Sequence, residues 1–112
     1  MDIQLRYVIC FVDNLDEAVH FYRDTLGFPL KFQSPDWTEF ATGETTLALH
    51  PASKRNPAGA FQLGFQVPDL DKFHQEMAGK GYQFTRPPEL EFGEKTARFV
   101  DPHGTEYSVS GK

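Results

Sequence analysis

The sequence predicts an α+β fold made of two tandem βαβββ modules. The segments VDNLDEAVHFYRDTLGF, from residue 12, and VPDLDKFHQEMAGKGYQF, from residue 67, share one pattern. Each follows an alternating apolar stretch, contains a turn with Asp, and continues into a helical segment closed by Gly and an aromatic residue. An internal repeat of this length indicates that the chain folds as two similar structural units.

The first module begins with LRYVICFV (5–12), whose apolar alternation predicts a strand. A helix over about 15–26 follows, with Asp13 or Asn14 as the N-cap and Gly27 as the residue that ends it. Its apolar residues fall at helical spacing and predict one buried stripe, formed by Leu15, Ala18, Val19, Tyr22 and Leu26.

Extended segments complete the first module. Residues 28–33 predict a strand, and WTEFATGETTLALH (37–50) predicts a hairpin that turns on Gly43. The following PASKRNPAG (51–59) is rich in Pro, Ala and Gly, which is typical of a linker.

The second module repeats this order. AFQLGFQV (60–67) predicts its first strand, and a helix with the stripe Leu70, Phe73 and Met77 ends at Gly79 and Gly81. An extended segment at 82–86 precedes the hairpin KTARFVDPHGTEYSV (95–109), which turns on Gly104.

Length and composition limit the function classes. The 112 residues predict one domain over 1–112, with modules at 1–50 and 60–112 joined by 51–59. A net charge of −5 without a basic run argues against nucleic acid as a partner. The short apolar runs argue against a membrane span or a signal peptide, and the one cysteine fits a reducing, cytoplasmic location.

The strand before VDNLDEAVHFYRDTLGF, the strand that ends in VPDL, and FVDPHGTEYSV together resemble the vicinal oxygen chelate superfamily. This superfamily includes glyoxalase I, bleomycin-resistance and fosfomycin-resistance proteins, and extradiol dioxygenases. The resemblance covers essentially the whole chain. It implies a mixed sheet that curls around a crevice, and a homodimer. The linker is compatible with modules that pair within a chain or are exchanged between chains.

Metal enzymes of this superfamily take one ligand from the first strand and one from the last strand of each module, usually His or Glu. The resemblance places Tyr7, Ala48, Gln62 and Ser108 at these positions. Divalent metals prefer several imidazole, thiolate or carboxylate donors, which this set lacks. We therefore expect no metal and no cofactor.

Strand alternation gives further residues the same inward facing as these four positions. With Trp37 and Arg98, whose facing is less clear from the pattern, they form the predicted ligand-binding set: Tyr7, Ile9, Phe11, Trp37, Thr46, Ala48, His50, Gln62, Gly64, Gln66, Arg98, Glu106 and Ser108. Such an apolar, partly aromatic wall suits a small organic ligand.

Three interpretations follow. The leading hypothesis is a metal-independent protein that binds a hydrophobic or aromatic small molecule, similar to the bleomycin-resistance branch. The alternative is an enzyme, such as a lyase, isomerase or dioxygenase-like protein, with His50 or Glu106 as an acid–base group, Tyr7 as a hydrogen-bond donor, or a divergent metal site. In the third, the same surface packs on itself as a core that supports a dimer.

The stretch Asp101-Pro102-His103-Gly104 combines residues that favour a turn. Asp can bond the backbone two residues on, Pro fixes φ, and Gly accepts a positive φ. We therefore expect His103 to be exposed at the tip of a hairpin and to have no catalytic role.

Overall fold

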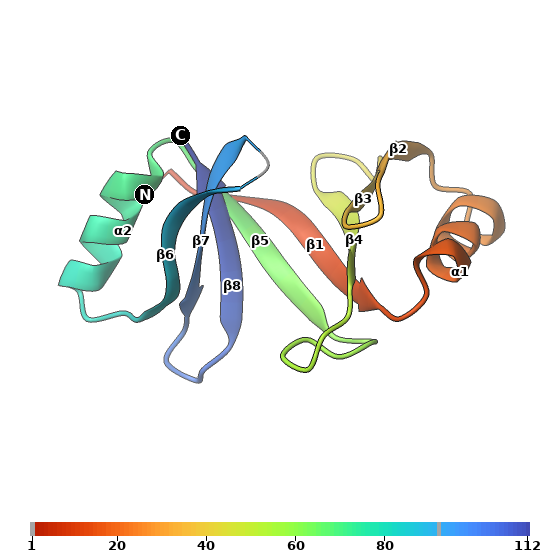
Figure 1. Cartoon of the computed structure of the whole chain (residues 1–112). Coiled ribbons are helices and arrows are strands. Elements are labelled where there is room, and N and C mark those ends of the chain that lie inside the picture. The colour runs from red at the N-terminus through yellow and green to blue at the C-terminus, as the bar shows by residue number, and fades with distance from the viewer. Residues whose placement is uncertain (1, 92) are drawn as a thin grey trace. The chain divides into compact units, whose positions relative to one another are not determined.

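The structure is a computed structural model that describes residues 2–91 and 93–112. Contacts divide the described residues into two compact units: a first unit, Arg6–Gln62, and a second unit, residues 63–91 and 93–112 with residues 2–5. Each unit contains one helical region and strands of a mixed sheet (Figure 1). The α+β fold class predicted from the sequence is therefore confirmed.

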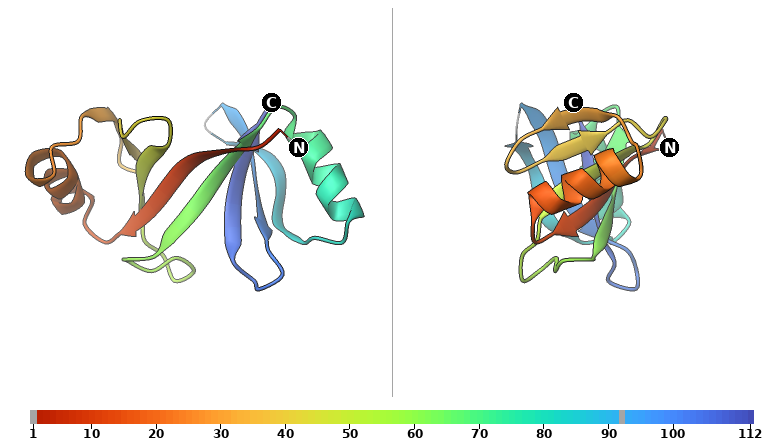
Figure 2. Two further views of the ribbon diagram at one scale, coloured as in Figure 1. Left: turned by 180° about the vertical axis from the view of Figure 1, so that it is seen from behind. Right: turned by 90° about the vertical axis from the view of Figure 1, so that its right-hand side faces the viewer.

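The first unit contains β1 (Gln4–Val12), which enters it at Arg6, α1 (Leu15–His20), η1 (Phe21–Thr25), β2 (Leu30–Gln33), β3 (Thr38–Phe40) and β4 (Thr46–Pro51). The strand order is β2-β3-β4-β1. β1 pairs with β4 in parallel, whereas β3 is antiparallel to both β4 and β2. Figure 2 shows α1 in front of these strands in its right-hand view.

The second unit contains β5 (Phe61–Val67), which enters it at Leu63, α2 (Leu70–Gly79), β6 (Phe84–Glu91), β7 (Glu94–Val100) and β8 (Glu106–Gly111). Its strand order is β5-β8-β7-β6, with β5 parallel to β8 and the other pairs antiparallel. Because this order and these directions repeat those of the first unit, the βαβββ repeat is confirmed.

A side-chain hydrogen bond caps the N-terminus of each helix. The Asn14 side chain accepts a hydrogen bond from the backbone amide of Glu17 at 3.1 Å, and Asp69 accepts one from Lys72 at 3.1 Å. These bonds satisfy backbone donors that have no partner within the helix. The sequence predicts one α-helix over 15–26, but after His20 the chain forms the π-helix η1, in which the amide of Leu26 donates to the carbonyl of Phe21.

Each helix packs on one sheet face of its own unit. In the first unit Val19 packs with Cys10, Phe40 and Leu49. Burial first, and the neighbouring Cys10 second, raise the pKa of Tyr22 at the margin of this cluster. In the second unit the buried residues between α2 and the sheet are Val67, Leu70, Phe73, Ala97, Phe99 and Val109. In each unit, the opposite face of the sheet is therefore not in contact with the helix of that unit.

Residues 51–59 lie within the first unit. The amide of Ala52 donates to the carbonyl of Val12 at 2.9 Å, and the amide of Gly59 donates to the carbonyl of Phe11 at 3.0 Å. These bonds tie the segment to the end of β1. The division into modules 1–50 and 60–112 stays a prediction.

The hairpin between β7 and β8 is organised by one carboxylate. Asp101 Oδ1 accepts hydrogen bonds from the amides of His103 at 2.9 Å and Thr105 at 3.0 Å, and Oδ2 accepts one from the Tyr107 hydroxyl at 2.9 Å. Desolvation of the carboxylate alone would raise the pKa of Asp101, but these hydrogen bonds outweigh it and lower the pKa. Gly104 has a φ of 87°, and His103 is exposed, so the predicted turn is confirmed.

No helix within residues 2–91 and 93–112 is long and apolar enough to span a membrane.

Candidate functional site

The sheet face of the first unit that lies opposite α1 is aromatic. Cys10 packs on the helix side, so alternation along β1 directs Ile9 and Phe11 to the other side. There they form a buried cluster with Ala48 of β4, and Tyr7 and Trp37 pack against it. The parallel register places Ile9 beside Ala48 and Phe11 beside His50.

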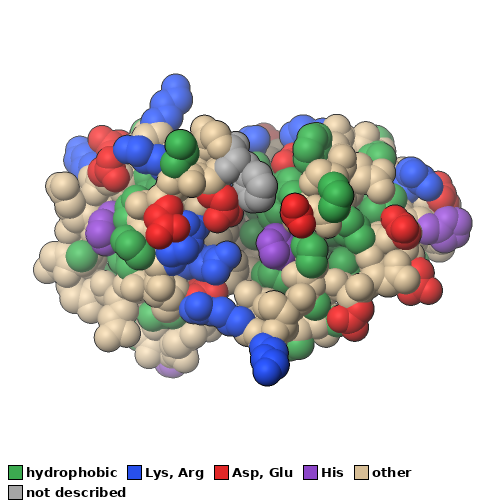
Figure 3. All heavy atoms as spheres, in the orientation of Figure 1, with side chains coloured by type: hydrophobic (Ala, Val, Ile, Leu, Met, Phe, Trp, Pro, Cys, Tyr) green, Lys and Arg blue, Asp and Glu red, His purple; other side chains and the backbone are tan. Residues whose placement is uncertain are grey.

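Trp37 connects the two ends of this face. Its ring makes edge contacts with Tyr7, at 5.3 Å between centroids, and with His50, at 6.4 Å. His50 also contacts the Phe11 ring at 5.5 Å. The structure therefore brings together six residues of the predicted ligand-binding set, which we call the aromatic face: Tyr7, Ile9, Phe11, Trp37, Ala48 and His50. Figure 3 shows a histidine among hydrophobic side chains.

A carboxylate fixes the orientation of Trp37. Its indole Nε1–H donates to Glu39 Oε2 at 2.7 Å, and Lys31 Nζ lies 3.6 Å from Glu39 Oε1. The Glu39 side chain is only 16% exposed, so its charge is held close to the aromatic face. The sequence analysis missed Glu39, although alternation with the buried Thr38 and Phe40 places it on this side.

The hydrogen bond of His50 determines its tautomer. Nδ1 lies 2.8 Å from the Pro51 carbonyl oxygen, which can only accept a hydrogen bond. Nδ1 therefore carries the proton, and the lone pair of a neutral imidazole is on Nε2. Within the described part of the chain, Nε2 has no hydrogen-bond partner. Chemically, the ring can accept a hydrogen bond or a proton at Nε2.

The corresponding face of the second unit is polar. Ala97, Phe99 and Val109 point toward α2, so alternation directs Arg98 and Ser108 to the opposite side. The register places Arg98 beside Ser108, and Ser108 beside Gly64. Three predicted residues thus form one row across β7, β8 and β5, and Gln66, also predicted, lies in the next row beside Ser110.

Arg86 joins this polar face because β6 is irregular. The register shifts on both sides of Arg86, between Phe84 and Arg86 and between Arg86 and Glu89. Such bulges re-aim side chains. The Arg86 guanidinium donates to the Thr96 hydroxyl and, at 2.9 Å, to Glu89. Sequence analysis missed Arg86, since the predicted strand at 82–86 stops there whereas β6 continues to Glu91.

The remaining predicted residues lie at the margins of these faces. Glu106 accepts a hydrogen bond from the Thr85 hydroxyl at 2.7 Å. Gln62 and Thr46 are buried, at 7% and 4% exposure, and both belong to the first unit. These residues are placed by the structure, but their roles in binding or catalysis stay predictions.

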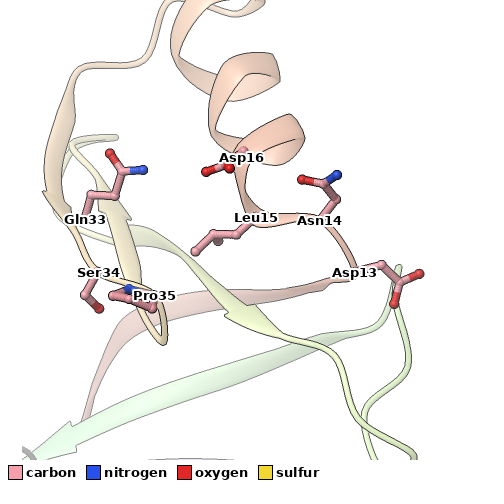
Figure 4. Close-up of a pocket in the computed structure, with 7 residues that line it drawn as sticks. All are labelled: Asp13, Asn14, Leu15, Asp16, Gln33, Ser34 and Pro35. Carbon is pink, nitrogen blue, oxygen red and sulfur yellow. The ribbon is translucent and has the colours of Figure 1, made fainter.

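A separate hollow of 580 Å³ lies where α1 begins, beside the segment after β2 (Figure 4). Leu15 points into it, Asp16 and Gln33 border it, and Asp13 points away. α1 has only six residues, and the Asn14 side chain already accepts the Glu17 amide, so the start of this helix is not by itself an anion-binding site.

The profile of the Glyoxalase/Bleomycin resistance protein/Dioxygenase superfamily matches residues 4–109. The chain belongs to this superfamily. The resemblance inferred from the sequence is thereby confirmed.

Individual superfamily relatives agree with the fold. The uncharacterized protein YraH of Bacillus subtilis (strain 168) is 26% identical, over 89% of this chain and 91% of YraH. A structure of methylmalonyl-CoA epimerase from Mycobacterium tuberculosis has a TM-score of 0.77 and 19% identity, and covers 96% of this chain and 86% of that one. Streptomyces coelicolor methylmalonyl-CoA epimerase, in complex with 2-nitronate-propionyl-CoA, has a TM-score of 0.80 and 17% identity, with 97% and 96% coverage. At these identities the two structures show a shared fold.

The four residues that the resemblance places at the metal-ligand positions are poor ligands for a divalent metal. Of the four ligand positions, Ala48 is fully buried and has no donor atom. Tyr7, Gln62 and Ser108 offer only neutral oxygen donors, whereas stable divalent sites use imidazoles, thiolates or carboxylates. Among the described residues, no group of three or more His, Cys, Asp or Glu could hold a metal ion.

Proposed function

We propose that this superfamily member binds a small organic molecule through its aromatic face, without a divalent metal. The observation that carries the proposal is the contact of Trp37 with both Tyr7 and His50, on the sheet face opposite α1. Tyr7, Trp37 and His50 are each partly buried, so part of each ring remains open to a ligand. Aromatic edges and faces arranged in this way favour an apolar or planar ligand.

The test uses uncharged aromatic probes, indole and 2-naphthalenemethanol, titrated into the full chain and followed by calorimetry and by NMR of the Trp37 indole N–H. We expect saturable binding with one site per chain and a shift of that indole signal. Trp37→Ala should weaken binding at least tenfold, which corresponds to about 1.4 kcal/mol.

Phe21→Ala is the matched control, because Phe21 is an aromatic residue of the same unit that is 48% exposed and lies on η1, outside the aromatic face. Its affinity should stay within twofold of the wild type. Absence of saturable binding by both probes in a folded protein, or equal losses in both variants, would refute the proposal.

Metal independence is tested in the same assay. Probe affinity should be unchanged after treatment with a chelator. A stoichiometric transition metal in protein purified without chelators, together with lost probe binding after its removal, would contradict this part of the proposal.

The tautomer of His50 favours a second candidate function, catalysis by proton abstraction. Its free Nε2 is a potential general base, and the Tyr7 hydroxyl has no hydrogen-bond partner within the described residues and could donate to a developing enolate. The epimerases of similar fold provide a first substrate to assay. Wild-type protein should exchange the C2 proton of methylmalonyl-CoA with deuterium, as followed by NMR, and His50→Gln should abolish exchange while it retains binding. Unchanged exchange in His50→Gln would exclude His50 as the base.

A further inference from the structure

Arg98 on β7 is a partly buried cation that has no partner among the described residues. It forms no ion pair, hydrogen bond or ring contact with residues 2–91 or 93–112. A guanidinium stays charged at every physiological pH. Partly removing such a charge from water without a counter-charge raises the free energy of the folded state, which is why charged groups away from bulk water are usually paired.

The immediate neighbours of Arg98 toward β5 are a residue with a hydroxyl group and a glycine. Ser108 is its register partner on β8, and Gly64 on β5 is next in the row. Gly64 has no side chain, and the Ser108 hydroxyl makes no hydrogen bond to a described residue. The Arg98 guanidinium and the Ser108 hydroxyl therefore lie on adjacent strands, which are about 4.8 Å apart. Neither of these donors has an acceptor among the described residues.

A second guanidinium lies on the other side of Arg98, but carboxylates of its own strand balance its charge. Arg86 is the register partner of Arg98 on β6, and the bulges described above turn Arg86 toward the same face. One nitrogen of Arg86 lies 2.9 Å from Glu89, and another lies 3.8 Å from Glu91 and donates to the Thr96 hydroxyl. Arg98 receives no such compensation.

The nearest acidic residue on β8 is already engaged. Glu106 lies two residues before Ser108, about 6–7 Å along the strand, and accepts the hydroxyl of Thr85 at 2.7 Å. No acceptor from the described residues therefore completes the row of Arg98 and Ser108. These donors match a negatively charged group with two oxygen atoms.

We propose that Arg98 and Ser108 bind the oxyanion, a carboxylate or a phosphate group, of a small-molecule ligand. Two guanidinium N–H groups donate to two oxygen atoms of the anion, and the Ser108 hydroxyl donates to one of them. Paired N–H donors match carboxylate and phosphate geometry and make the stronger, charge-assisted class of hydrogen bond. This site lies within the second unit and does not depend on the aromatic face of the first.

The experiment titrates inorganic phosphate and, separately, acetate into the ¹⁵N-labelled full chain at constant ionic strength. NMR follows the Arg98 Nε–H and the Ser108 amide. At least one anion should produce saturable shifts of both signals with the same dissociation constant, and the anion with the smaller constant identifies the preferred class of oxyanion.

Variants assign the effect. Arg98→Gln should reduce the affinity at least tenfold, and Ser108→Ala should reduce it by a smaller factor without altering the fold. Arg23→Gln is the matched control: Arg23 lies in the first unit and is paired with Asp24 at 2.9 Å. Its affinity should stay within twofold of the wild type.

Two results would overturn the proposal. One is a linear, non-saturating response to both anions, as expected from general surface charge. The other is a saturable response at Ser108 that Arg98→Gln leaves unchanged. Because the probes are charged and non-aromatic, either result is distinguishable from failure of the uncharged aromatic probes to bind the first unit.

Discussion

Replacing Gly111 by Ala should destabilise the second unit strongly. A Cβ atom at Gly111 would lie 2.5 Å from the Val67 carbonyl oxygen and 3.2 Å from the Leu70 backbone nitrogen. Both atoms belong to the backbone, so neither can rotate away. Val67 on β5 and Gly111 on β8 are partners in the parallel register. The two strands would have to move apart by about 0.5–1 Å to bring the added Cβ atom to a tolerable contact distance. Overpacking of this kind costs about 1–3 kcal/mol, and a weakened ladder bond adds about 1 kcal/mol.

Gly79→Ala is the matched control. Gly79 ends α2, its Cβ would meet nothing within 4 Å, and it has no positive φ. Because Ala loses less backbone entropy than Gly in a helix, we expect stabilisation of up to about 1 kcal/mol.

The assay is urea unfolding followed by far-UV circular dichroism, which reports on both units, whereas Trp37 fluorescence reports on the first unit. A loss of about 3 kcal/mol lowers the midpoint by roughly 1–3 M, since small proteins lose about 1–3 kcal/mol per M of urea. A Gly111→Ala protein within about 0.5 kcal/mol of the wild type would refute the steric argument.

Three other variants test the core, a helix cap and the hairpin. Phe40→Ala removes a fully buried side chain and should cost about 3–5 kcal/mol in the same unfolding assay. Asn14→Ala removes the hydrogen bond to the Glu17 amide and should cost about 1 kcal/mol, with loss of amide protection in α1 by hydrogen exchange. Asp101→Asn removes a carboxylate whose pKa is lowered in the folded protein. The stability that this carboxylate contributes is present above its unfolded pKa of about 4, and it is lost as the pH falls through the folded pKa. The variant should therefore lose less stability than the wild type between neutral pH and pH 2, and equal losses would contradict this account.

Strand alternation made much of the aromatic face predictable. Cys10 and the residues on either side of it form an uninterrupted strand, so helix-side and opposite-side positions follow directly from the sequence. The same reasoning gives Ala48 and His50 the facing of Ile9 and Phe11, and the parallel register places them side by side. Trp37 precedes β3, so strand alternation does not determine its facing, and its contacts with Tyr7 and His50 depend on tertiary packing.

The parts that the sequence did not predict are irregularities of the backbone. β6 continues through Pro87 and Pro88 to Glu91, which is possible because it is the end strand in the order of its unit. Its register shifts turn Arg86 to the polar face, and no period-2 pattern contains that information. Likewise, η1 adds one residue per turn after His20, whereas the helical spacing of the stripe predicts a regular α-helix.

The duplicated registers show how one fold provides two chemistries. Ile9 beside Ala48 in the first unit corresponds to Gly64 beside Ser108 in the second, because each pair joins equivalent positions on the first and last strands of its module. The backbone pairing is the same, but an apolar pair has been replaced by a small residue and a hydroxyl.

The next pair along the strands follows the same rule. Phe11 beside His50 corresponds to Gln66 beside Ser110, so an aromatic contact in one unit is matched by amide and hydroxyl groups in the other. Repetition of the fold therefore determines which positions face away from the helices, and the local sequence determines which side chains stand at those positions. The uncharged aromatic probes therefore test the first unit, and the oxyanion probes test the second. Binding of one class of probe does not replace the experiment with the other class.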